Sequence, residues 1–396
     1  MDAADLEALA SPAGRLLLAS LPPYDPALAL TISTELRRLG TPPALVTAAL
    51  TQSRLRAKAR AKFGDFADGM LFTDAGVEQA TRLTVAARHA ARYRDAGLNA
   101  VADLTCGIGG DAMALAALGL DVVAVDRDET AAALATLNLR HFPNARVVMA
   151  DALDLDLAGL GVQALWADPG RRTQAGRRVF DPAAYAPPLP RLLDLARDWP
   201  LGVKVGPGIA HSDVPAAAEA QWVSEQGTVV ECGLWFGPLA PDGPGRTAAV
   251  IGRQGAARLS QTGAPALKAG PLGEWLFEPD GAVIRAGLIQ EAARALDNPR
   301  LLNRTIAYVT ADSPADSPFF AGFRVLDSLP FELKRLRAYL RERGVGPLTI
   351  KKRGTAVTPE ALRARLSLRG SAAATIILTR LGDSQHAIVV EPLPTD

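Results

Sequence analysis

The sequence is poor in cysteine, histidine and aromatic residues, and neither charge is in excess. Its 396 residues include 2 cysteines, 4 histidines and 5% aromatic residues, and 43 Lys and Arg balance 42 Asp and Glu. Cys106 and Cys232 are far apart in sequence and fit no zinc or thioredoxin spacing, so we expect neither a disulfide nor a metal site. The balanced charge excludes a chain that is basic throughout, and 48% hydrophobic residues exclude a disordered one.

Long apolar stretches are also missing. No run reaches about 18 uncharged apolar residues, which argues against a membrane-spanning helix. Residues 1–5 lack the basic segment of a secretory signal, so we expect a cytoplasmic protein. At about 100 to 200 residues per domain, the length predicts two or three domains with hydrophobic cores.

Residues 1–97 are predicted to be helical, because apolar residues recur there at helical spacing and β-branched runs are rare. Proline pairs at 22–23 and 42–43 divide this region, and residues 77–94 predict a longer amphipathic helix. Between them, every second residue from Arg54 to Lys62 is cationic. This run fits a solvated surface and a phosphate-contacting surface equally well.

Residues 98–252 show the alternation of strands and helices that is typical of an α/β domain. Strands separated by helix-length segments predict a mostly parallel sheet. The last two predicted strands are joined by a Gly/Pro-rich turn, which predicts a hairpin and an antiparallel edge strand. The predicted strands are residues 100–104, 121–125, 146–150, 164–167, 201–205, 228–232 and 248–251.

Residues 253–323 are predicted as a connecting or accessory segment, and residues 324–396 as a basic α+β domain. The last region contains a basic amphipathic helix at 331–343 and strand-like runs at 348–351, 375–379 and 387–390. Residues 331–380 include twelve Lys or Arg and three Asp or Glu. This excess suits contact with a phosphate backbone, and a solvated basic helix is the alternative.

A glycine-rich loop, DLTCGIGGDA at residues 103–112, follows the first predicted strand. Its glycines let the backbone turn tightly and approach a ligand at the start of the next helix. The spacing also fits the dinucleotide-binding fingerprint. However, Asp103 occupies a strand end that dinucleotide folds usually keep apolar, and its carboxylate suits a ligand ammonium group. We interpret Cys106 as a small apolar filler of this loop.

Acidic residues follow the next strands as well. Asp126 is placed to accept hydrogen bonds from two ribose hydroxyls, and Asp151 to accept one from an adenine amine. Each acid alone fits a helix N-cap equally well, but together with the loop they predict a ligand site. Asp103 favours S-adenosylmethionine over a nicotinamide dinucleotide. The predicted cofactor contacts in this region are Asp103, Cys106, Gly107, Gly109, Gly110, Asp126, Arg127, Asp151 and Ala152.

Four segments match a known family. They are residues 70–73 (MLFT) with 78–81 (EQAT), the loop at 103–112, residues 168–173 (DPGRRT) with 178–182 (RVFDP), and residues 350–354 (IKKRG) with 378–380 (LTR). On these segments the chain resembles class I S-adenosylmethionine-dependent methyltransferases, specifically the bacterial family that carries a THUMP-like domain. The resemblance implies a Rossmann-like catalytic domain, S-adenosylmethionine as cofactor and an RNA substrate.

The motif at residues 168–171 bears on the methyl acceptor. Methyltransferases that act on exocyclic amines of nucleobases carry Asp/Asn-Pro-Pro-aromatic at this strand end, where the ring stacks on the base. Asp168 and Pro169 match and are the predicted catalytic residues. Gly170 and Arg171 depart from the pattern, so amine methylation is an inference. An arginine can stack on a base or bind phosphate, and a solvated loop is the alternative.

Further contacts are predicted from position in the sequence. Lys204 lies in an apolar strand and faces either the substrate pocket or, by snorkelling, the surface. Class I enzymes often close over the methionine end of the cofactor just before the first strand, so Phe72 and Thr73 are predicted cofactor contacts, with helix capping by Thr73 as the alternative. The predicted substrate contacts are Arg171, Arg172, Tyr185, Lys204, Lys351, Lys352 and Arg353.

The sequence therefore predicts an S-adenosylmethionine-dependent methyltransferase of α/β class. We expect an N-terminal helical region (1–97), a Rossmann-like, mostly parallel sheet with an antiparallel edge strand (98–252), a connecting segment (253–323) and an α+β THUMP-like domain (324–396) that docks structured RNA, either tRNA or rRNA. A small-molecule methyltransferase and a non-catalytic cofactor- and RNA-binding protein are the rival hypotheses. The methylated atom and the oligomeric state are not predicted.

Overall fold

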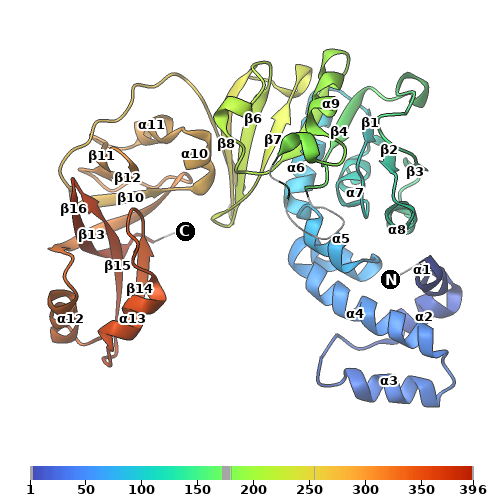
Figure 1. Ribbon diagram of the computed structural model, residues 1–396, viewed down its shortest axis with the longest axis horizontal. Coiled ribbons are helices and arrows are strands. Elements are labelled where there is room, and N and C mark those ends of the chain that lie inside the picture. Colours follow the sequence, from blue (N-terminus) through green and yellow to red (C-terminus); the bar gives the residue numbers. More distant parts are fainter. Residues whose placement is uncertain (1–2, 172–178, 180, 254, 395–396) are drawn as a thin grey trace. The chain divides into compact units, whose positions relative to one another are not determined.

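The computed structural model describes residues 3–171, 179, 181–253 and 255–394 (Figure 1). The chain divides into two units, which we call the N-terminal unit (Met1–Val205 with Leu234–Gly243) and the C-terminal unit (Gly206–Gly233 with Pro244–Asp396). The four domain boundaries expected from the sequence stay a prediction. In the described residues, no helix combines the length and the apolar character that crossing a membrane requires.

The N-terminal unit begins with the predicted helical region. The expected single helix over residues 77–94 is wrong, because the chain leaves the helix at residues 80–82. Thr81 in this break is buried and donates a hydrogen bond to Asp111, so tertiary contacts override the helical pattern. The helices are α1 (Ala3–Ala10), α2 (Pro12–Ser20), α3 (Ala29–Arg38), α4 (Pro43–Phe63), the 3₁₀ helix η1 (Gly64–Gly69), α5 (Asp74–Gln79) and α6 (Leu83–Asp95).

A parallel sheet follows, and it confirms the expected fold class. Its strands in the N-terminal unit lie in the order β3-β2-β1-β4-β5, and all four pairings between them are parallel. The carboxyl ends of these strands therefore meet at one edge, where ligands bind in such sheets. The strands are β1 (Ala100–Asp103), β2 (Asp121–Asp126), β3 (Ala145–Met149), β4 (Ala164–Ala167) and β5 (Leu201–Val205), with helices α7 (Gly110–Ala117), α8 (Glu129–Leu139) and α9 (Leu189–Asp194) between them.

The strands after β5 differ from the expectation in one pairing. The predicted hairpin between residues 228–232 and 248–251 is wrong: β8 (Gly245–Gly252) pairs in parallel with β6 (Glu219–Glu225) and antiparallel with β9 (Gly255–Ser260), which supplies the antiparallel edge. The sequence did not predict β6, because its polar Glu219, Gln221, Ser224 and Glu225 are buried together with its apolar residues. Strand β7 spans Thr228–Trp235.

The rest of the C-terminal unit forms a second sheet, in the order β11-β12-β10-β13-β16-β15-β14. Strands β10, β11 and β12 fall in the segment expected to connect domains, yet they belong to the same sheet as the predicted C-terminal strands. The elements are β10 (Trp275–Pro279), α10 (Gly281–Ala286), α11 (Ile289–Ala292), β11 (Arg300–Asn303), β12 (Ile306–Ala311), β13 (Phe320–Pro330), α12 (Leu333–Glu342), β14 (Val345–Lys352), α13 (Pro359–Leu366), β15 (Ala372–Leu381) and β16 (Ser384–Pro392).

Helices α12 and α13 bury leucines spaced by one turn. Leu336 and Leu340 of α12 lie in the same hydrophobic core as Leu362 and Leu366 of α13. The i, i+4 spacing places these leucines on one side of each helix, so the charged residues take the other sides. The basic helix predicted at residues 331–343 is confirmed as α12.

Candidate active site

The glycine-rich loop connects β1 to α7 and is bonded to both neighbouring strands. The Leu104 amide donates to the Trp166 carbonyl at 2.8 Å, and the Cys106 amide donates to the Val125 carbonyl at 2.9 Å. Gly107 and Gly109 have φ angles of 54° and 86°, a left-handed conformation in which glycine is favoured. Cys106 is buried, and burial raises the pKa of its thiol, which agrees with its interpretation as a filler.

Asp103 has a carboxylate oxygen without a protein partner. The side chain is buried at the end of β1, and its Oδ1 accepts a long hydrogen bond of 3.3 Å from the Thr105 amide. Its Oδ2 is buried and has no hydrogen-bond partner in the described part of the chain. Burial raises the pKa of Asp103, and the nearby carboxylate of Asp111 raises it further. A buried acceptor of this kind fits a ligand that brings a donor, such as an ammonium group.

Asp126 anchors the loop from the end of β2. Its Oδ2 accepts from the Gly107 amide and its Oδ1 from the Asp128 amide, both at 2.9 Å. The side chain remains partly exposed, so the carboxylate still has lone pairs for hydroxyl donors. The neighbouring Arg127 lies 3.4 Å from the Asp151 carboxylate, which joins the ends of β2 and β3, and Ala152 is buried.

Asp168 at the end of β4 forms an ion pair with Lys204 of β5. Lys204 is buried and also donates to the Thr81 hydroxyl at 2.8 Å, so it does not snorkel to the surface. Burial raises the pKa of Asp168, and the positive charge of Lys204 opposes this shift. The Asp168 amide donates to the Thr105 hydroxyl at 2.6 Å, which ties the motif to the glycine-rich loop.

A buried polar network continues behind this pair. The Thr81 hydroxyl donates to Asp111 at 2.7 Å, and His89 Nδ1 lies 2.9 Å from the other Asp111 oxygen. Burial alone would raise the pKa of Asp111, but the hydrogen bond and charge of His89, with Lys204 and Thr81, hold it below its usual value. These residues were not predicted as a group from the sequence, although Asp111 and Thr81 both lie in segments that carry the family resemblance.

The segment after β4 is paired with residues near Tyr185. The Gly170 amide donates to the Ala186 carbonyl at 2.8 Å, and the Ala186 amide donates back at 3.0 Å. This pairing brings the half-buried Tyr185 next to the motif, as its predicted substrate role requires. Pro169 is buried and Arg171 is half-buried, whereas Arg172 lies outside the described residues.

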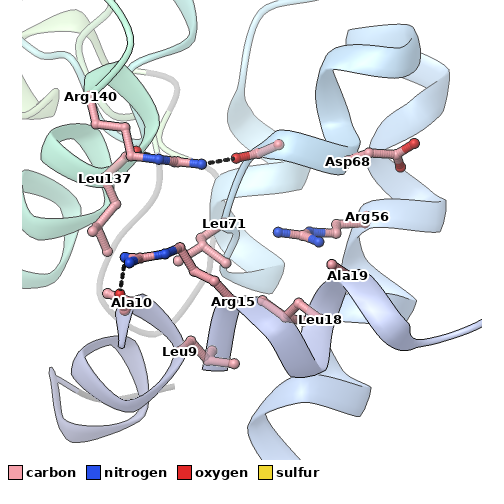
Figure 2. Close-up of a pocket in the computed structure, with 11 residues that line it drawn as sticks. Leu9, Ala10, Arg15, Leu18, Ala19, Arg56, Asp68, Leu71, Leu137 and Arg140 are labelled. Atoms are coloured by element: carbon pink, nitrogen blue, oxygen red, sulfur yellow. Dashed lines mark hydrogen bonds between the residues drawn. The ribbon is translucent and has the colours of Figure 1, made fainter. Parts of the chain in front are cut away.

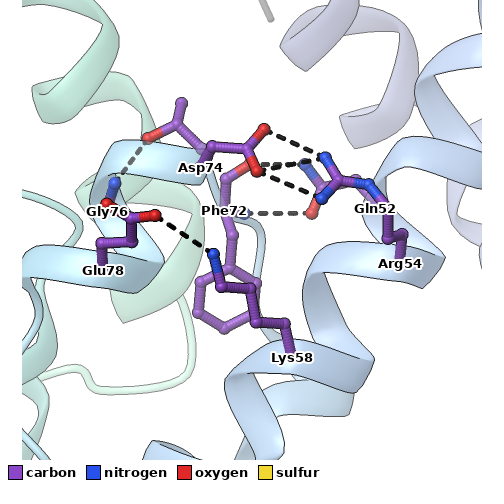
Figure 3. Close-up of polar contacts among 8 residues, drawn as sticks. Gln52, Arg54, Lys58, Phe72, Asp74, Gly76 and Glu78 are labelled. Carbon is purple, nitrogen blue, oxygen red and sulfur yellow. Dashed lines mark hydrogen bonds and ion pairs between the residues drawn. The ribbon is translucent and has the colours of Figure 1, made fainter.

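Two amide side chains hold residues 71 and 72 over the loop. Asn138 of α8 bonds to both backbone groups of Leu71, at 2.8 and 3.0 Å, and to the Ile108 carbonyl at 2.9 Å. Gln52 of α4 makes the corresponding pair of bonds to Phe72, at 2.7 and 3.0 Å (Figure 3). The Phe72 ring is fully buried in the core, so its placement gives no support to the predicted cofactor contact.

Thr73 caps α5 by accepting from the Gly76 amide at 3.0 Å. The structure therefore shows the alternative that was given for Thr73, which is helix capping. The alternating cations of α4 contact residues 68–80, the segment that includes Thr73. Arg54, Lys58 and Lys62, spaced by one turn, face α5, whereas Arg56 and Arg60 face η1 and the residue after it.

All five cations of this run have protein partners. Arg54 pairs with Asp74 at 3.0 Å and Lys58 with Glu78 at 3.3 Å (Figure 3), and Arg60 pairs with Asp68 at 2.5 Å. Arg56 donates to the Met70 carbonyl at 2.9 Å, and Lys62 donates to the carbonyls of Glu78 and Ala80 at 2.6 and 2.7 Å. The run therefore fastens α4 to residues 68–80, and only Arg56 and Lys62 lack an acidic side chain as a hydrogen-bonded partner in the described residues.

The predicted substrate contacts of the C-terminal unit differ in whether an acidic side chain lies close to them. Lys351 lies 2.6 Å and Arg353 3.4 Å from the carboxylate of Glu278, which compensates part of their charge. Lys352 is exposed. In the part of the chain that the structure describes, no three His, Cys, Asp or Glu side chains are grouped to hold a metal ion.

Comparison with known proteins identifies the family of the chain. Residues 321–392 match a family model described as THUMP domain-like, and residues 2–59 match a domain of unknown function, DUF8688. Uncharacterized S-adenosylmethionine-dependent methyltransferases from two strains of Mycobacterium tuberculosis are each 36% identical over 337 residues, which cover 83% of this chain and 91% of theirs.

A crystal structure of a presumed methyltransferase from Porphyromonas gingivalis W83 has the same fold, with a TM-score of 0.72, 19% identity, and coverage of 93% of this chain and 99% of that one. The buried Asp103 oxygen and the strand-end acids are hydrogen-bond acceptors that suit the ammonium group and the ribose hydroxyls of the cofactor. The chain belongs to the S-adenosylmethionine-dependent methyltransferases, with S-adenosylmethionine as cofactor and a THUMP-like domain at its C-terminal end.

Proposed function

We propose that this methyltransferase modifies a nucleobase of structured RNA, either tRNA or rRNA, and that its C-terminal domain docks the RNA. The observation that carries the proposal is a set of exposed cations in the THUMP-like region that have no acidic partner in the described residues. They are Lys334, Arg335, Arg341, Lys352, Arg363, Arg365, Arg369 and Arg380.

The hydrogen bonds of these arginines leave their charge uncompensated. Arg341 donates to the Ser367 carbonyl at 3.3 Å and Arg363 to the Leu348 carbonyl at 3.0 Å. A backbone carbonyl orients a guanidinium without neutralising it, so α12 and α13 present fixed positive charge. Aromatic side chains are scarce in this region, and this favours recognition of a folded phosphate backbone over stacking on a single strand.

In the methyl-transfer step, S-adenosylmethionine supplies an activated methyl group, and the protein has to orient the acceptor. We assign this role to Asp168 and Pro169 at the end of β4. Lys204 and the Thr105 hydroxyl fix the carboxylate and the amide of Asp168, so its second carboxylate oxygen has a defined direction. Such preorganisation is the main contribution that a protein makes to a methyl displacement. Asp103, Asp126 and Asp151 are the proposed cofactor contacts.

The first test is transfer of a radiolabelled methyl group from S-adenosylmethionine to total tRNA and rRNA from a strain that lacks the protein. We expect label in a defined RNA that is already methylated in the parent strain. No label in any RNA fraction, with S-adenosylhomocysteine still bound in calorimetry, would refute the RNA assignment in favour of a small-molecule acceptor or a non-catalytic protein.

The role of the cationic surface is tested by salt dependence. Replacing Arg365 and Arg369 with alanine should reduce the slope of log affinity for RNA against log salt by about 2, or about 1 per lost phosphate contact. The matched control replaces Arg94 and Arg197 of the N-terminal unit with alanine. These arginines pair with Asp95 and Asp194, and the control removes as many positive charges as the test variant. Equal effects of the two double variants would contradict a docking role for Arg365 and Arg369.

The acceptor assignment is tested by the double variant Asp168→Leu, Lys204→Met. Removing both members of a buried ion pair is close to neutral for stability, whereas removing one leaves an unpaired charge that costs about 3–5 kcal/mol. We expect a folded protein that binds S-adenosylhomocysteine and transfers no methyl group. Wild-type transfer by this variant would exclude Asp168 from the acceptor site.

A further inference from the structure

A cavity of about 180 Å³ lies among the helices of the N-terminal unit, away from the carboxyl edge of the sheet. It is formed by α1, α2, α4, η1 and the C-terminal end of α8 (Figure 2). Because α8 is 11 residues long and begins at the carboxyl edge, its far end lies about 16 Å from that edge. The cavity is therefore separate from the proposed cofactor contacts.

The cavity has an aliphatic wall and a cationic rim. Leu9, Leu18, Leu71 and Leu137 supply the apolar surface. Arg15, Arg56 and Arg140, from three different helical segments, supply guanidinium groups, and Figure 2 shows them around the same space. This combination of a compact apolar wall with convergent charged groups is typical of small-molecule sites.

Within the described residues, the hydrogen bonds of these three arginines go to backbone carbonyls. Arg15 donates to the Ala10 carbonyl, Arg56 to the Met70 carbonyl at 2.9 Å, and Arg140 to the Gly69 carbonyl at 3.2 Å. These bonds hold the guanidinium groups in place and leave their charges uncompensated.

Among the described residues that line this cavity, Asp68 is the one acid, and its ion pair is with an arginine outside the cavity. Asp68 is paired with Arg60 at 2.5 Å, and Figure 2 shows its carboxylate turned away from the three guanidinium groups. Burial lowers the pKa of Arg56, the charge of Asp68 opposes this shift, and the charge of Arg140 adds to it. Arginine stays protonated, so three guanidinium charges remain at this cavity.

We propose that this cavity binds a phosphate monoester attached to a compact apolar or aromatic group. Three guanidinium forks match the oxygens of a phosphate dianion, with hydrogen bonds as well as charge. A cavity of 150 Å³ accommodates benzene, so about 180 Å³ accommodates a small ring or the end of a chain. Free nucleotides and the 5′ end of an RNA strand share this chemistry.

The test is calorimetric titration of the full chain with phenyl phosphate, in saturating S-adenosylhomocysteine so that the cofactor site is filled. We expect one site, with no binding of phenol. The double variant Arg15→Met, Arg140→Met should weaken binding at least about tenfold, since each charge-assisted hydrogen bond contributes about that factor. Both side chains are exposed, so the variant should fold, and thermal unfolding checks this.

The matched control is Arg54→Met, on the same helix as Arg56 but paired with Asp74 outside the cavity. It should leave phenyl phosphate affinity unchanged. Equal binding by the wild type and the double variant, or no binding to the wild type, overturns the proposal. So does an equal loss in the control, because that would indicate a general charge effect.

Displacement of phenyl phosphate identifies the source of the ligand. A 5′-phosphorylated RNA hexanucleotide that displaces it, compared with a 5′-hydroxyl hexanucleotide that does not, assigns the site to an RNA end. Displacement by adenosine 5′-monophosphate but by neither RNA assigns it to a free nucleotide. Both results support the site independently of the methyl acceptor, and displacement by none of the three refutes it.

Discussion

Asp103→Asn should make the cofactor-free protein more stable and its cofactor binding weaker. In the wild type, one carboxylate oxygen is buried without a partner among the described residues, and burial and the charges of Asp111, Asp168 and Asp126 disfavour the ionised form. Asparagine has the same shape and keeps an acceptor for the Thr105 amide. At a pH above the pKa in the folded state, each unit by which folding raises a carboxyl pKa lowers the free energy of unfolding by about 1.4 kcal/mol. We expect a gain of about 1–3 kcal/mol at pH 8.

The pH dependence has a definite sign. A carboxyl group whose pKa is raised on folding holds its proton longer in the folded state, so its contribution to stability is complete below about pH 3.9 and is lost as pH rises through the folded pKa. Wild type and variant should therefore unfold at similar temperatures near pH 4. At pH 8 the variant should unfold about 2–4 °C higher for each kcal/mol gained.

Cofactor affinity should change in the opposite direction. Loss of a charge-assisted bond to the ligand ammonium group costs about 1.5–3 kcal/mol, which weakens S-adenosylhomocysteine about 10- to 150-fold. 5′-Methylthioadenosine lacks that ammonium group and should bind both proteins alike. A variant that is less stable at pH 8 and binds S-adenosylhomocysteine normally would refute the assignment of Asp103.

Three further predictions concern the residues around the site. Burial, with Lys204 and Arg82, lowers the pKa of Lys62 to about 8, so acetylation of Lys62 followed by mass spectrometry should be half-maximal near pH 8. Because the folded state loses this proton first, stability should rise from pH 8 to about 10.4, and Lys62→Met should abolish that rise. Asn138→Leu removes three hydrogen bonds to backbone groups and should cost about 3–5 kcal/mol in urea unfolding, whereas Arg54→Ala, which breaks an exposed pair, should cost less than about 1 kcal/mol. Gly109→Ala forces a residue with a side chain into a left-handed conformation, so it should lower the free energy of unfolding by about 1–2 kcal/mol and weaken S-adenosylhomocysteine binding. If neither stability nor affinity changed, glycine would not be required at this position.

Local sequence pattern predicted most of the proposed cofactor contacts. The strands β4 and β5 were predicted to the residue, and the acids at successive strand ends were identified, because parallel strands place their carboxyl ends at one edge. The basic helix of the C-terminal region was also predicted, because its leucines recur at i, i+4 spacing. Strand β6 was missed because its polar residues are buried and bonded to distant partners, such as Glu219 with Thr247 and Arg258.

The fold class, the glycine-rich loop and the local excess of positive charge could be predicted from the sequence, since each depends on residues close together in the chain. Which charges are paired became known only from the folded structure. Lys204 is joined to Asp168, Lys351 to Glu278, and the alternating cations of α4 to residues 68–80. Side chains that are far apart in sequence find their partners through packing, and no local periodicity encodes those distances.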